Sequence, residues 1–160
     1  MIHVRRAVSL DSGQMAELLN EVISAGGTTA LTEAVTRNDI AIRMSGGQSA
    51  IWHVAEDDTG MILGFQWVEP HKDHGPEVAN IATFARIGQT GIGIGSALFD
   101  ATRDAALVIG YRWINATIRT DNEGGLIYYQ SRGFETYGRV EGVRLASGQI
   151  VDQVLKRYDL

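Results

Sequence analysis

The chain contains no cysteine. This absence excludes disulfides, thiolate metal ligands and a cysteine nucleophile, and it leaves the redox compartment open. Any covalent intermediate would therefore need another residue. Long apolar runs are also missing, since none approaches the ~20 residues that span a bilayer, so we expect no membrane partner. Because the sequence shows no paired spacing of metal-ligating residues, we expect no metal either.

Positive charge is scarce as well. The chain has 14 Lys and Arg against 19 Asp and Glu, for a net charge of −5, and the basic residues are scattered. A nucleic-acid partner is therefore not expected. The first ten residues contain the pair Arg5-Arg6 in an alternating pattern and lack the apolar core of a signal peptide, so a cytoplasmic location is the expectation. At 160 residues, the chain has the length of one domain, 1–160.

Apolar periodicity predicts a mixed α/β fold around one sheet. Alternating runs predict strands, and apolar residues spaced three and four apart predict helices. Strands are expected at 2–8, 50–56, 61–69, 78–87, 111–119, 135–145 and 149–158, and helices at 15–23, 32–44, 96–109 and 120–132. The segment 70–76 is expected to be a polar loop. The resulting order is β-α-α-β-β-β-α-β-α-β-β.

Three alternate glycines, Gly91, Gly93 and Gly95, directly precede one of the predicted helices. Without Cβ atoms the backbone can bring consecutive N–H groups against an anion, and the helix N-terminus adds its dipole. A P-loop is excluded because Gly95 is followed by Ser96 and Ala97, without a Lys. A dinucleotide fingerprint would need a third glycine where Ser96 stands. A phosphate cradle and a plain turn both remain open at this point.

Two segments resemble motifs of the GCN5-related N-acetyltransferase superfamily. Residues 90–98, T-G-I-G-I-G-S-A-L, are similar to its pyrophosphate segment R-G-x-G-x-G-x-A-L, and residues 122–134, N-E-G-G-L-I-Y-Y-Q-S-R-G-F, to its N-x-x-A-x-x-L-Y-E-x-x-G-F. The element order also matches, so the resemblance spans essentially the whole chain. L-L-N-E-V at 18–22 and T-T-A at 28–30 are similar in layout to the phosphinothricin and methionine sulfoximine acetyltransferase branch.

The resemblance implies that the chain binds acetyl-CoA. It places the diphosphate on the glycine segment, the pantetheine arm along a strand that splays from its neighbour, and a thiolate-protonating tyrosine at Tyr129. A core-packing role for Tyr129 remains the alternative, and Tyr128 is expected to pack. Asn122 could cap its helix, bind the cofactor, or both. The implied cofactor residues are Thr83, Phe84, Ala85, Thr90, Gly91, Ile92, Gly93, Ile94, Gly95, Ser96, Asn122 and Tyr129.

The residues that would bind and deprotonate the amine acceptor are less well defined by the sequence. Candidates for the general base, in or beside the polar loop, are Glu69, His71, His74 and Glu77, and a water chain is the alternative. Asn80 stands where the phosphinothricin branch carries a substrate-side Glu, and Thr28, Thr29, His71 and His74 are candidate substrate contacts. Thr90 replaces an Arg or Gln and removes a charge-assisted phosphate contact. With Lys72 the nearest match to the branch's substrate-binding Arg, these departures count against phosphinothricin itself.

The predicted function is acetyl transfer from acetyl-CoA to the amino group of a small molecule, an amino acid or analogue, directly in a ternary complex. A non-catalytic acyl-CoA sensor of the same fold is the alternative, and a nucleotide-binding domain of another family is a third candidate. The two C-terminal strands could pair at an exposed sheet edge, which would allow a homodimer.

Overall fold

Seven strands form one sheet in the computed structural model, which describes residues 1–89 and 93–160. The sheet order is β1-β2-β3-β4-β5-β7-β6, and every neighbouring pair is antiparallel except the parallel pair β4 and β5. The strands are β1 (His3–Arg6), β2 (Ile51–Glu56), β3 (Ile62–His71), β4 (Gly75–Ala85), β5 (Trp113–Arg119), β6 (Glu135–Arg144) and β7 (Ile150–Asp159).

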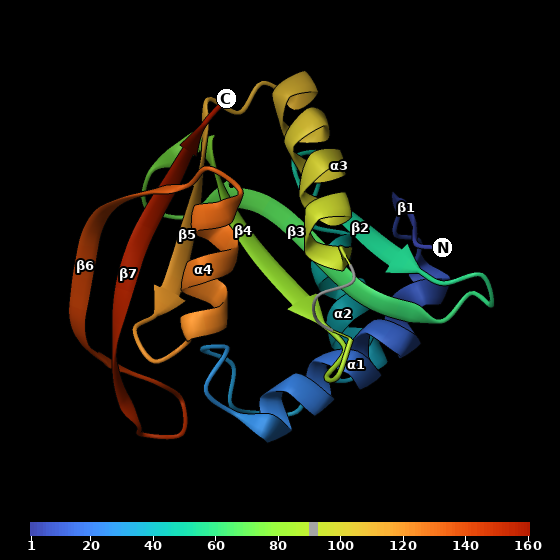
Figure 1. Cartoon of the computed structure of the whole chain (residues 1–160), viewed down its shortest axis with the longest axis horizontal. Helices are drawn as coiled ribbons and strands as arrows, with labels where there is room; N and C mark the ends of the chain where they lie inside the picture. The colour runs from blue at the N-terminus through green and yellow to red at the C-terminus, as the bar shows by residue number, and fades with distance from the viewer. Residues whose placement is uncertain (90–92) are drawn as a thin grey trace.

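Four α-helices and one short 3-10 turn accompany the sheet in the described ranges (Figure 1). They are η1 (Ser9–Asp11), α1 (Ser12–Ala25), α2 (Arg37–Met44), α3 (Ile94–Ile109) and α4 (Glu123–Ser131). The predicted element order and the mixed α/β class are confirmed. No helix in the described part of the chain is long and apolar enough to cross a membrane.

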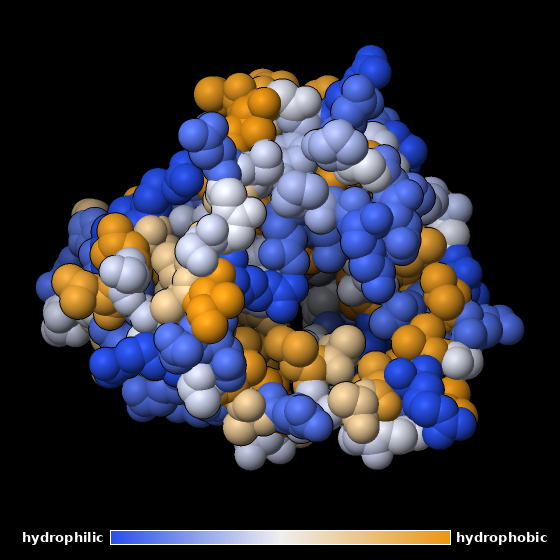
Figure 2. All heavy atoms as spheres, turned by 180° about the vertical axis from the view of Figure 1, so that it is seen from behind, coloured by the Kyte–Doolittle hydropathy of each residue, from blue (hydrophilic) through white to orange (hydrophobic). Residues whose placement is uncertain are grey.

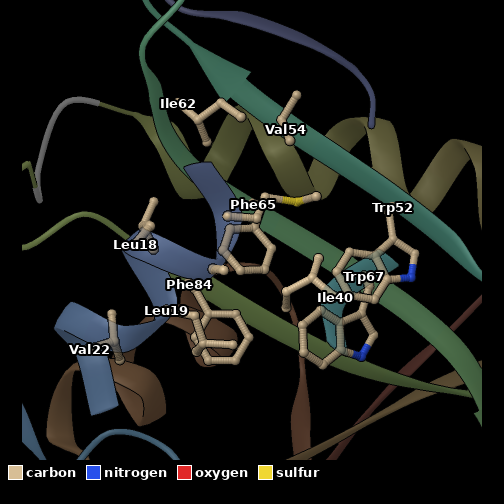
Figure 3. Close-up of a cluster of buried hydrophobic side chains, with 12 residues drawn as sticks. Leu18, Leu19, Val22, Ile40, Trp52, Val54, Ile62, Phe65, Trp67 and Phe84 are labelled. Atoms are coloured by element: carbon tan, nitrogen blue, oxygen red, sulfur yellow. The ribbon is translucent and has the colours of Figure 1, made fainter. Parts of the chain in front are cut away.

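The helices bury both faces of the sheet. Residues of α1 and α2, such as Leu18 and Ile40, pack on Phe65 and Trp67 of β3, as Figure 3 shows. On the other face, Phe99 of α3 belongs to a second buried cluster that includes residues of β4, β5 and α4. The period-2 alternation of the strands explains this division, because successive side chains point to opposite faces.

The second helix begins later than its apolar pattern predicts. Thr36 caps α2 reciprocally with Asp39: its hydroxyl accepts from the Asp39 N–H at 3.0 Å, and the Asp39 carboxylate accepts from the Thr36 N–H at 2.9 Å. The preceding chain is held by the amide of Asn20, which bonds both the N–H and the carbonyl of Val35 at 2.8 Å. The predicted start at position 32 is therefore wrong.

The prediction of a polar loop at 70–76 is also wrong. β3 and β4 continue through it as a hairpin in which His71 faces Gly75, so that only three residues make the turn. The ring Nδ1 of His71 accepts from the backbone N–H groups of Asp73 and His74 at 3.1 and 3.2 Å. Polar residues here form a tight turn, because the side chain of His71 satisfies its backbone donors.

β4 and β5 separate after a short contact. They pair only at Val78 with Trp113, Ala79 with Ile114, and Asn80 with Asn115. Beyond Asn80, β4 stays paired with β3 while β5 stays paired with β7, and the two strands diverge in Figure 1. The predicted splay of the strand at 83–85 is present.

Candidate active site

A cavity of about 830 Å³ occupies the space between the diverging strands. Its walls come from the segment after α1, from β4 and β5, from the start of α3 and from α4. Seen from behind, the surface is hollowed near the middle of the molecule (Figure 2). The cavity therefore reaches elements that are far apart in sequence but meet where the sheet opens.

The start of α3 forms one end of the cavity. Its lining includes Gly93, Ile94, Gly95 and Ser96. Gly93 precedes the helix with φ of 86°, a conformation that glycine adopts readily. The first backbone N–H groups of a helix have no intrahelical acceptor and suit an anion. The predicted cradle residues Thr90, Gly91 and Ile92 lie outside the described residues.

Gly95 is required by packing as well. A Cβ at this position would lie 2.5 Å from Cε1 of Tyr128, well inside van der Waals contact. The Tyr128 hydroxyl donates to the Gly95 carbonyl at 2.7 Å. Tyr128 thus packs as expected, but it also lines the cavity and joins a hydrogen-bond network, and burial raises its pKa to about 12.

Tyr129 lines the cavity and also belongs to the core. Its side chain belongs to the buried cluster of α3, α4 and β5, with the residue only 7% exposed. Its hydroxyl lies 2.8 Å from Oγ1 of Thr83 on β4. Burial raises the pKa of Tyr129 well above its ordinary range, and the hydrogen bond with Thr83 partly opposes this rise. The phenol is therefore protonated and neutral at physiological pH.

Thr28, Thr29 and Asn80 line the same cavity. The Thr29 carbonyl accepts from Nη1 of Arg119 at 3.1 Å, and the Thr28 carbonyl accepts from Nδ2 of Asn122 at 3.3 Å. These bonds tie the segment after α1 to the end of β5 and the start of α4. Asn122 also caps α4 by accepting from the Gly125 N–H at 3.0 Å. Its predicted capping role is confirmed.

Asn80 belongs to a chain of amides and hydroxyls. Its Oδ1 accepts from Nδ2 of Asn115 at 2.9 Å. Asn115 is fully buried, and its Oδ1 accepts from the hydroxyl of Tyr137 on β6. The neutral amide at position 80 is therefore held in place across β4, β5 and β6.

Four acceptor-side candidates do not line the cavity within the described residues: Glu69, His71, His74 and Glu77. Glu69 is ion-paired with Arg43 at 2.6 Å. The Glu77 side chain is 65% exposed beside Arg112. His71 supports the turn described above. The geometry gives these residues no direct contact with the cavity.

Several polar residues that line the cavity or contact its lining were not identified from the sequence. Arg43 and Arg119 line the cavity, whereas Lys72, the nearest cation by sequence, does not. The polar residue Gln66, fully buried in β3, bonds both Thr83 and Tyr128. The sequence does contain an indication of this residue, because Gln66 interrupts the otherwise apolar run F-Q-W-V at 65–68.

Comparisons with known proteins agree with this geometry, although no protein-family model matches the chain. The chain is 28% identical over 162 residues to YwnH of Bacillus subtilis (strain 168), a candidate phosphinothricin acetyltransferase, covering 98% of this chain and 94% of YwnH. A GCN5-related N-acetyltransferase from Kribbella flavida matches with a TM-score of 0.83 and 26% identity, covering 99% of this chain and 98% of the other.

A phosphinothricin acetyltransferase from Sinorhizobium meliloti, solved in complex with acetyl-CoA, matches with a TM-score of 0.90 and 21% identity over 99% of this chain and 88% of the other. These comparisons confirm the GCN5-related N-acetyltransferase fold and the resemblance seen in the sequence. Within that class, the similarity to YwnH confirms the likeness to the phosphinothricin acetyltransferase branch along nearly the whole chain.

Proposed function

We propose that the chain is an acetyl-CoA-dependent N-acetyltransferase that acetylates the amino group of a small molecule in a ternary complex. The observation that carries the proposal is the meeting of the α3 N-terminus and Tyr129 in the lining of one cavity, at the point where β4 and β5 separate. The fold is shared with an acetyltransferase solved with acetyl-CoA.

The cofactor would lie between the two strands. The N-terminus of α3, including the amides of Gly95 and Ser96, would hold the diphosphate, completed by Thr90, Gly91 and Ile92. The edge of β4 at 83–85 has no β5 partner and lines the cavity. Its backbone groups would bind the pantetheine arm and stabilise the oxyanion that develops on the thioester.

In the proposed reaction, the neutral amine attacks the thioester carbonyl, a C–N bond forms and the C–S bond breaks. The departing thiolate takes the proton of Tyr129, the new amide nitrogen loses its proton to water, and a proton from solvent restores the phenol. At ordinary pKa values, proton transfer from a phenol to a thiolate is unfavourable by about 2 kcal/mol. Burial raises the pKa of Tyr129 and makes this proton transfer more unfavourable. We therefore expect the proton to move as the C–S bond breaks.

The lining of the cavity disfavours an acceptor with several positive charges. Among the described lining residues none is Asp or Glu. The lining arginines, Arg43, Arg86 and Arg119, are each paired with a carboxylate that is not among those lining residues. Polyamines and aminoglycosides would find no carboxylate partner there. An amino acid or analogue fits better, although Asn80 in place of the branch's Glu argues against phosphinothricin itself.

The same lining favours removal of the amine proton through water. Glu69, Glu77, His71 and His74 lie outside the cavity in the described structure, and Glu69 is held by Arg43. An amine with a pKa of about 9 to 10 is already about 1–10% neutral near pH 8, so a water chain can supply the reactive form.

Tyr129→Phe tests the proposal. We expect thiol release to fall by about 10²- to 10³-fold, because the phenol proton is lost, while calorimetry shows unchanged coenzyme A binding. Tyr158→Phe makes the same change on β7, outside the described cavity lining, and should leave turnover unchanged. A wild-type chain that binds acetyl-CoA but releases no thiol with any amine would favour the non-catalytic sensor instead.

A further inference from the structure

Four buried or half-buried polar side chains form a continuous network beside the cavity. Gln66 and Thr83 face each other in the register of β3 and β4. Nε2 of Gln66 lies 2.8 Å from Oγ1 of Thr83 and 3.1 Å from the hydroxyl of Tyr128. Thr83 in turn lies 2.8 Å from the Tyr129 hydroxyl, and Tyr128 bonds the Gly95 carbonyl at 2.7 Å. One end of the network is therefore the Gly95 carbonyl, which can only accept a hydrogen bond.

The direction of the first bonds follows from that carbonyl. Because the Gly95 carbonyl has no proton, Tyr128 must donate to it. A tyrosine hydroxyl has one proton, so toward Gln66 the Tyr128 oxygen can only accept. The amide atom that faces it must then be the nitrogen, because the amide oxygen would meet another oxygen with no proton to share. This fixes the orientation of the Gln66 amide.

The same nitrogen also donates to Thr83, which fixes the next bond. Thr83 Oγ1 accepts from Gln66, and its remaining partner among the described residues is the Tyr129 hydroxyl. In that bond either hydroxyl can be the donor, and the arrangement that leaves the Tyr129 proton free is the one in which Thr83 donates. We propose that Gln66 and Thr83 are positioning residues that leave the Tyr129 proton free to point into the cavity, toward the departing thiolate; this proposal rests on the proposed function.

The burial of Gln66 agrees with such a role. Gln66 is fully buried, and its Oε1 has no hydrogen-bond partner among the described residues. Leaving a buried acceptor unpaired costs about 1–3 kcal/mol, whereas an apolar residue would fill this position of β3 without that cost. The arrangement also places a donor on the Tyr129 oxygen, which stabilises the negative charge that forms there when the proton leaves.

Thr83→Val removes the donor to Tyr129 with little change in shape. We expect kcat to fall about 10- to 100-fold, as for loss of a hydrogen bond to a developing charge. The KM for acetyl-CoA and the affinity for coenzyme A measured by calorimetry should stay within about twofold, because the proposed cofactor contacts of this strand are made by its backbone. Thr83→Ser keeps the hydroxyl and should retain most of the wild-type kcat.

A double-mutant cycle with Tyr129→Phe decides whether Thr83 acts through Tyr129. In the Tyr129→Phe background there is no phenol proton to direct, so Thr83→Val should cause no further loss of kcat. Thr117→Val is the matched control: the same chemical change in the same cavity, but on β5. Its effect should be the same in both backgrounds.

Gln66→Glu provides a second, independent variant. A carboxylate would accept from Thr83 rather than donate to it, so Tyr129 would turn its proton toward Thr83. We expect kcat to fall at least as far as in Thr83→Val, again with no added effect in Tyr129→Phe. Melting curves establish whether this buried substitution folds; if it does not, the Thr83 cycle decides alone.

The proposal is overturned if Thr83→Val loses the same factor with and without Tyr129, or if Thr83→Ser is as impaired as Thr83→Val. Failure of the proposed function is distinguishable from either result, because it appears in the wild-type chain as an absence of acetyl-CoA binding or of thiol release.

Discussion

At the scale of single residues, the glycine segment serves two purposes in the same turn of helix. Gly93 adopts a positive φ just before α3, and Gly95 lets the Tyr128 ring lie against the helix backbone. The Tyr128 hydroxyl then fixes the orientation of the Gln66 amide in the hydrogen-bond network that reaches Tyr129. A pattern that resembles an anion cradle therefore also builds the wall beside the proposed general acid.

Gly95→Ala should be destabilising. The added methyl would overlap the Tyr128 ring, and overpacking of this kind costs about 1–3 kcal/mol. Gly124→Ala is the matched control, because it is also a helical glycine and its nearest neighbour would lie 3.9 Å away; it should be neutral or stabilising by up to about 1 kcal/mol. Urea unfolding measures both, and equal free energies of unfolding for the two variants would contradict the packing account.

The sequence allowed Tyr129 and Asn122 to be chosen as site residues, because both stand in a motif with a defined spacing. Gln66 and Arg119 could not be chosen in the same way. Their roles depend on partners on other elements, Thr83 and Tyr128 for one and the Thr29 carbonyl for the other. Local periodicity contains no information about such pairs.

At the scale of elements, alternation and helical spacing predicted every strand and helix in order, and errors occurred where side chains bond the backbone. The reciprocal cap of Thr36 and Asp39 delays α2, and the ring of His71 closes the β3–β4 turn. In both places, polar residues whose pattern predicts a helix or a loop are held in another conformation by local hydrogen bonds. The divergence of β4 from β5 depends on strand pairing across the sheet, so it followed only from the resemblance.

β2 carries a buried histidine that makes the stability of the sheet depend on pH. Burial, with a smaller contribution from Arg6, lowers the pKa of His53 to about 4. The unfolded chain, with a pKa near 6.5, binds the proton more readily. Stability should therefore be complete above about pH 6.5 and decline as the pH falls toward 4, by up to about 3 kcal/mol.

His53→Gln removes this titration, so the free energy of unfolding of the wild type should fall relative to that of the variant as the pH falls from 7 to 4. Urea unfolding at several pH values measures the difference, in which the titration of the other groups cancels. Parallel curves for the two proteins would contradict the assignment.

At the scale of the whole molecule, the cavity joins the two helical layers through the opening in the sheet. The start of α3 and Tyr129 of α4 line the proposed cofactor side, and the segment after α1, with Thr28 and Thr29, lines the proposed acceptor side. The cofactor could be inferred from the sequence because its site is contiguous with two motifs. The proposed preference for an amino acid over a polycation could not, because the absence of carboxylates from the described lining appears only in the folded chain.

The central claim is that this cavity transfers an acetyl group from acetyl-CoA to a small amine. The most direct measurement is free thiol release from acetyl-CoA with a panel of amino acids, polyamines and aminoglycosides, with mass spectrometry of the acetylated product. The account predicts amine-dependent thiol release that is strongest with an amino acid or analogue and is lost in Tyr129→Phe. No thiol release with any member of the panel, or binding of ATP or NAD in preference to coenzyme A, would contradict it.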